Sequence, residues 1–184
     1  MDKNDIHYRL TRFSNWFSKV LLGGIVLGMV GMVMKMMGLP AGGFVFVFAM
    51  SVLMLLLFFQ IGISFMYVMS NLPLALLGAF CSLGLVLGFL AIIFRFQVWM
   101  GWRVMLFVSL PVYLFSGIFM LVFFLKRKHL HAAHRKFLYL NLIIPFAFAM
   151  LLFLISFSLR PAQFYKTFKA REAAGNAILF PSAP

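Results

Sequence analysis

Negative charge is missing from the apolar stretches of this chain. The only acidic residues are Asp2, Asp5 and Glu172, and all three lie outside the five long hydrophobic runs that fill residues 20–159. Transport of protons or metal cations through a membrane commonly uses a carboxylate inside the apolar region, because that group can carry the charge and release it. The composition of the runs therefore argues against a proton or cation pump.

Cysteine is also nearly absent. Cys81 is the only one and lies inside an apolar run. One cysteine cannot form a disulfide within the chain or supply a cysteine-based metal site. We interpret Cys81 as a small apolar residue at a helix contact rather than as a reactive thiol.

Apolar side chains dominate what is present. The chain has 184 residues, of which 65% are hydrophobic and 10% charged. A soluble domain of this length has too little interior to hide so much apolar surface, so lipid is the expected solvent. The net charge of +13 lies mainly at the ends of the apolar runs. This placement indicates anionic lipid headgroups, rather than nucleic acid, as the partner of the positive charge.

The hydrophobic runs predict an all-α integral membrane protein with five transmembrane helices. Each run is close to the roughly 20 residues that cross the hydrocarbon core. Gly- and Pro-containing turns at 38–43 and 70–73 are short, so consecutive helices are expected to be antiparallel neighbours. The predicted spans cover residues 20–37, 44–69, 74–94, 104–125 and 137–159.

These spans divide the chain into six segments. Residues 1–19 are basic, and the spacing of Tyr8, Phe13, Trp16 and Phe17 suits a short interfacial helix. The remaining segments are a first hairpin at 20–69, a second at 70–125, a basic histidine-containing loop at 126–136, a fifth helix at 137–159 and a basic tail at 160–184.

The two hairpins show an internal repeat with a constant offset of 60 residues. A duplication would give both hairpins the same orientation, as in parallel repeats. The repeated glycines would form small-residue faces that bring the first helices of the two hairpins together at the bundle centre. The alternative is that glycine is simply common in membrane helices. The matched pairs are Gly24 with Gly84, Gly28 with Gly88, and Lys35 with Arg95.

The turn at the end of each repeat resembles a known motif. Residues 35–42 read Lys-Met-Met-Gly-Leu-Pro-Ala-Gly and resemble the Lys-x-x-His-Trp-Pro-Gly-Ala turn of the GldL family, as does Arg-Phe-Gln-Val-Trp-Met-Gly-Trp at 95–102. GldL is the inner-membrane subunit of the motor for gliding and type IX secretion in Bacteroidota. The resemblance implies a helical hairpin in the inner membrane whose first turn faces the periplasm.

This chain departs from that family in three respects. The family's histidine is replaced by Gly38 in one turn and Val98 in the other. Helices 44–69 and 104–125 contain no counterpart of its acidic residue, and the long cytoplasmic coiled region is missing. The resemblance therefore implies the hairpin architecture without the proton-driven motor.

Lysine and arginine counts predict a cytoplasmic N-terminus and an external C-terminus in a bacterial inner membrane. Nine of these residues fall on the inside and seven on the outside. The inside set is Lys3, Arg9, Arg12, Lys19, Lys126, Arg127, Lys128, Arg135 and Lys136. A re-entrant fifth run, or a C-terminus on the inside, is the alternative.

Two cations near span ends are candidate binding residues. Lys35 and Arg95 are expected to extend outward to the membrane interface, as most such side chains do. The alternative is that they hold an anionic ligand or a partner's carboxylate, together with Arg103. Polar residues within the runs are predicted to form interhelical hydrogen bonds, and two prolines to kink their helices. These residues are Ser51, Gln60, Ser64 and Asn141, with Pro111 and Pro145.

Loop 126–136 is predicted to bind lipid headgroups through Lys126, Arg127, Lys128, Arg135 and Lys136. Its histidines add positive charge as the pH falls through about 6.5. A metal site is the weaker alternative, because the surrounding cations would repel a metal ion. The histidines are His129, His131 and His134.

No enzyme motif is present: the runs contain no nucleophile–base pair, phosphate loop or metal-ligand set. We therefore predict a non-enzymatic protein without a cofactor that scaffolds or associates with membrane partners, or with copies of itself. The alternative is a small transporter or channel for an anionic or apolar solute that uses Lys35 and Arg95.

Overall fold

The computed structural model describes residues 3–68, 71–126, 132–158 and 166. Within these residues the chain forms helices and no strands, as predicted. The helices are α1 (Lys3–Met36), α2 (Gly42–Val68), α3 (Leu72–Phe96), α4 (Trp102–Leu125), α5 (Ala132–Phe137), the π-helix η2 (Leu138–Ile143) and α6 (Ile144–Ser158).

Five segments of the described chain are long and apolar enough to cross a membrane, which confirms the predicted all-α membrane architecture. The fifth span is assembled from α5, η2 and α6, which follow one another without a break. The five segments are Ser14–Met36, Gly42–Met66, Leu72–Phe96, Trp102–Leu125 and His134–Ser158.

The N-terminal part of the chain differs from the prediction. The helix predicted within residues 1–19 is continuous with the first span, because α1 runs from Lys3 to Met36. The first span also begins earlier than residue 20, at Ser14. Ser14 and Ser18 are buried, so this part of α1 packs against the bundle instead of lying apart from it.

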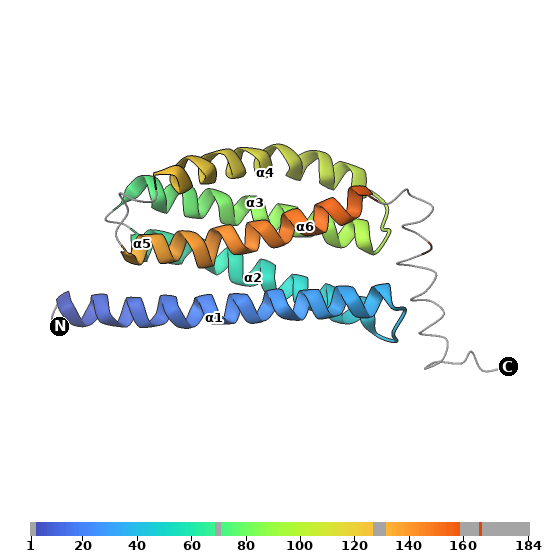
Figure 1. The fold of residues 1–184 in the computed structure, drawn as a ribbon, viewed down its shortest axis with the longest axis horizontal. Helices are drawn as coiled ribbons and strands as arrows, with labels where there is room; N and C mark the ends of the chain where they lie inside the picture. The colour runs from blue at the N-terminus through green and yellow to red at the C-terminus, as the bar shows by residue number, and fades with distance from the viewer. Residues whose placement is uncertain (1–2, 69–70, 127–131, 159–165, 167–184) are drawn as a thin grey trace.

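The helices pack in chain order: α1 on α2, α2 on α3, and α3 on α4, with α6 also against α3 (Figure 1). The turns after α1 and α3 both lie at the right-hand end of the bundle in that view. The two hairpins therefore have the same orientation. The first helices of the two hairpins do not pack together, however, because α2 lies between α1 and α3. The prediction that these helices meet at the bundle centre is wrong.

Aromatic and aliphatic side chains from every span form the main core. Phe46 of α2 meets Phe96 of α3 with ring centroids 5.2 Å apart, and Phe89 meets Phe148 of α6 at 5.9 Å. These rings are at most 5% exposed. Bulky rings fill the space between helices, so the bundle is held by packing, which is the main attraction between helices in lipid.

Pro145 explains the irregular fifth span. Proline lacks a backbone N–H, so it cannot donate to the carbonyl of the fourth preceding residue, Asn141. The chain forms the π-helix η2 directly before this proline, and Ile144 N–H donates to Tyr139 O. Gln60 of α2 then donates to the carbonyl of Asn141 at 2.8 Å. The proline therefore creates an acceptor that a neighbouring helix uses. The other proline, Pro111, lies within the continuous helix α4.

Candidate functional site

The turn after α1 ends the helix with two backbone hydrogen bonds that differ from the regular helical pattern. Leu39 N–H donates to Met34 O at 2.9 Å, and Gly38 N–H donates to Lys35 O at 3.2 Å. Gly38 has a positive φ of 70°. This is the Schellman arrangement, in which a left-handed residue lets the last carbonyls of a helix find donors.

The turn after α3 repeats this arrangement 60 residues later. Trp99 N–H donates to Phe94 O at 2.9 Å, and Val98 N–H donates to Arg95 O at 3.1 Å. The rings of Phe94 and Trp99 meet edge to face at 5.2 Å, which is the apolar contact that accompanies such an end. Val98 takes the left-handed conformation, with φ 55°, although it is β-branched and strained there.

Lys35 turns inward at its turn. Its side chain is 1% exposed, and Nζ donates to Gln97 Oε1 at 2.7 Å. Gln97 Nε2 in turn donates to Gly43 O, at the start of α2, at 3.1 Å. The expectation that Lys35 extends to the interface is therefore wrong. The buried ammonium joins the first turn to the second instead.

Arg95 is also turned inward and is 8% exposed, against the same expectation. Nε donates to Ser156 Oγ at 3.2 Å, and an Nη donates to Ser156 O at 3.4 Å. Its guanidinium lies 4.1 Å from the ring centroid of Trp102, within the range of a cation–π interaction. Arg95 thus links the second turn to α6.

Arg103 lies beside Arg95, and its side chain is exposed. Its guanidinium is 5.5 Å from the same Trp102 ring. The structure thus brings Arg95 and Arg103 together around one indole, whereas Lys35 bonds Gln97 of the other turn. Of the three candidate binding residues, Arg103 alone presents its charge to the outside.

A second group of hydrogen-bonded polar residues connects α1, α2 and η2, and Ser18 is the member that the sequence did not single out. Ser18 Oγ lies 2.5 Å from Asn141 Oδ1. Gln60 and Asn141 form the predicted interhelical hydrogen bond, whereas Ser64 donates within its own helix and Ser51 is exposed. Gln60 Oε1 and Asn141 Nδ2 are buried without a hydrogen-bond partner.

The repeated glycines face the second helix of their own hairpins. A Cβ on Gly24 would lie 2.8 Å from Leu53 of α2, and one on Gly28 would lie 2.8 Å from Met50. A Cβ on Gly84 would lie 2.7 Å from Ser116 of α4, whereas Gly88 leaves ordinary contact distances of 3.5 Å. Gly24, Gly28 and Gly84 therefore allow close approach within each hairpin.

The basic loop is described only in part. Arg127, Lys128, His129 and His131 lie outside the described residues. Lys126, Arg135 and Lys136 are exposed, and His134 is half-buried in α5. Cys81 is 1% exposed, and its thiol lies 3.6 Å from Ser116 O, in keeping with a packing role.

Comparison with known proteins found no match: no family model, no curated protein and no solved structure resembles this chain significantly. The proposed function therefore rests on the fold and on the two equivalent turns after α1 and α3.

Proposed function

We propose that this chain is a non-enzymatic, multi-pass inner-membrane protein that associates with other membrane proteins, or with its own copies, through its outer faces. The observation that carries this proposal is the environment of Gly23 in α1 and Gly62 in α2. Both are exposed, and a Cβ added to either would meet nothing within 4 Å. The fold does not need glycine at these positions, whereas helix–helix association in lipid uses small residues for close approach.

The inward direction of the cations adds support. Lys35 and Arg95 hold helices together through Gln97 and Ser156. A carrier would need to expose these charges to its solute. Transport of an anionic or apolar solute is therefore the weaker candidate, since it would require both hydrogen-bonded links to open.

The equivalent turns support a duplicated hairpin as the origin of the first four spans. The same pair of backbone hydrogen bonds recurs at a 60-residue offset, although the residues there differ. The architecture we propose is similar to the GldL-type hairpin, with the N-terminus in the cytoplasm and both turns on the periplasmic side.

Leucine substitutions at the exposed glycines test association. We expect Gly23→Leu and Gly62→Leu to leave the helical content unchanged and to abolish cross-linked species in native membranes. Val108→Leu also places a leucine on an exposed helix face, that of α4, and is the control that should keep the cross-links. Gly24→Leu is the control for folding, since its side chain would collide with Leu53.

Two results would contradict the proposal. One is an unchanged cross-linking pattern in both glycine variants. The other is a wild-type protein that runs as a partnerless monomer when it is extracted from native membranes under mild conditions.

A further inference from the structure

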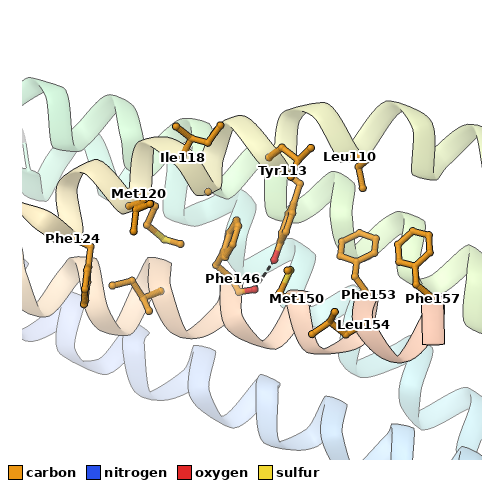
Figure 2. A pocket seen from close by; sticks show the side chains of 14 residues that line it. Leu110, Tyr113, Ile118, Met120, Phe124, Phe146, Met150, Phe153, Leu154 and Phe157 are labelled. Carbon is orange, nitrogen blue, oxygen red and sulfur yellow. Dashed lines mark hydrogen bonds between the residues drawn. The ribbon is translucent and has the colours of Figure 1, made fainter.

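An apolar groove of about 550 Å³ runs between α4 and α6. Tyr113 and Phe146 form its floor, with rings stacked at 4.1 Å and the Tyr113 hydroxyl donating to Phe146 O at 2.6 Å (Figure 2). Its walls include Leu110, Leu114 and Leu121 of α4, and Phe153 and Phe157 of α6. The groove exists because α4 packs on α3 and leaves a gap towards α6.

The groove is long enough to hold a lipid chain. Its α4 wall extends from Leu110 to Phe124. At 1.5 Å per residue this is about 21 Å, whereas one leaflet of the hydrocarbon core is about 15 Å thick. A fatty acyl chain that spans one leaflet can therefore lie entirely within this groove, which is longer than the chain.

A positive charge stands at one end of this groove. Arg103 precedes Leu110 by seven residues, which is two helical turns, so both lie on the same stripe of α4 as Leu114, Gly117 and Leu121. Arg103 is exposed, and Arg95 flanks the same Trp102 ring.

The spans offer Arg103 no carboxylate partner. The described residues 14–68, 71–126 and 132–158 contain no Asp or Glu. Guanidinium groups bind phosphate oxygens through paired, charge-assisted hydrogen bonds. Along α4, an indole ring and a cation are followed by an apolar groove. A lipid whose phosphate adjoins an acyl chain therefore matches the order of these features.

We propose that the groove between α4 and α6 is a binding site for one anionic glycerophospholipid. Its phosphate binds at Arg103, beside Arg95, and one acyl chain lies against Tyr113 and Phe146. This site is distinct from the basic loop, whose first residue, Lys126, caps the opposite end of α4. It is also independent of the proposed protein association.

The test reconstitutes the full-length protein in nanodiscs of equal parts phosphatidylcholine and phosphatidylglycerol. Native mass spectrometry then measures which phospholipid stays bound after release. The wild type should retain phosphatidylglycerol in preference to phosphatidylcholine. Arg103→Gln should lower the retained phosphatidylglycerol roughly fivefold, since one cation at an anionic surface contributes about that factor. Leu114→Trp should reduce retention of both lipids, because its indole fills the groove.

Lys19→Gln is the matched control, since it removes an exposed cation of α1, a helix that does not line the groove. It should leave retention unchanged, as should excess inorganic phosphate, because phosphate alone lacks the acyl chain. Equal retention of the two lipids by the wild type would overturn the proposal. So would an equal loss in Lys19→Gln, which would indicate general surface attraction. Displacement by inorganic phosphate would also overturn it, because it would indicate a site for the free ion.

Discussion

The turn after α1 and the turn after α3 have the same backbone hydrogen bonds and different side-chain partners. Where the first turn has Gly42, the second has Trp102, 60 residues later. A Cβ on Gly42 would lie 2.7 Å from Lys35 N, so the start of α2 touches the end of α1. In the second turn, the Trp102 ring covers Arg95 instead.

This difference explains how two similar hairpins are joined in one bundle. Each cation reaches forward along the chain: Lys35 to Gln97 in the second hairpin, and Arg95 to Ser156 in α6. The same backbone arrangement forms both turns, and their different side chains connect each turn to the next unit. The following substitutions test whether these roles are truly separate.

Gly42→Ala should have the largest effect. The new methyl group would meet backbone atoms of Lys35, which cannot move aside as a flexible side chain can. We expect a loss of about 3 kcal/mol in the free energy of unfolding, at the upper end of the usual cost of overpacking. Reversible unfolding in mixed detergent, followed by circular dichroism, measures it.

Gly62→Ala is the matched control, because its Cβ meets nothing within 4 Å. Here alanine should be neutral or stabilise the helix by up to about 1 kcal/mol. Equal destabilisation by the two variants would mean that the close contact at Gly42 has no special role.

Gln97→Leu should rank second. It removes the acceptor that lies 2.7 Å from the buried Lys35 Nζ. A hydrogen bond to a charged group contributes about 2 kcal/mol, so we expect a loss of that size. Adding Lys35→Met removes the charge that needs the acceptor, so the double variant should be more stable than Gln97→Leu alone. Strictly additive losses in this double-mutant cycle would contradict a direct link between the turns.

Gly38→Ala should cost less, about 1 kcal/mol, because an L-residue with a side chain is disfavoured in the left-handed conformation. The φ of 70° at Gly38 is the basis of this expectation. Thermal unfolding of the variant, compared with that of the Gly62→Ala protein, isolates the conformational strain. A gain in stability would show that the first turn is not left-handed at this residue.

Trp102→Phe should have the smallest effect. Phenylalanine keeps a ring beside Arg95 and Arg103 but gives a weaker cation–π interaction than tryptophan. We expect a loss of about 0.5 kcal/mol. Chemical unfolding curves measure the loss of stability in this variant and in Trp99→Phe. The comparison distinguishes the roles of the two indoles, because the Trp99 ring contacts Phe94 instead. A larger loss than for Gln97→Leu would reverse the proposed ranking.

The sequence was sufficient for features that depend on local hydropathy. The five spans follow from the apolar runs, and the hairpin order follows from short turns such as residues 38–43. The direction of Lys35 could not be predicted, because its acceptor lies 62 residues away. The early start of the first span could not be predicted either, because it depends on a contact between distant parts of the chain. Ser18 is buried against Asn141 of the fifth span.

Some hydrogen-bonding groups could have been predicted from the sequence. Pro145 deprives Asn141 of its helical donor, so the pattern Asn-x-x-x-Pro in an apolar run signals an acceptor that another helix must satisfy. That Gln60 supplies the donor depends on the packing of α2. The pairing of Arg95 with Arg103 around Trp102 likewise needed the geometry of the second turn.

Cysteine accessibility is the most direct measurement of the central claim, that two hairpins of like orientation hold their turns together on one side of the membrane. Single cysteines replace Ala41, Met100 or Lys126, each exposed, in a Cys81→Ser background. A membrane-impermeant thiol reagent applied to the periplasmic side should label positions 41 and 100 and should not label position 126. Labelling of positions 41 and 100 from opposite sides of the membrane would contradict it.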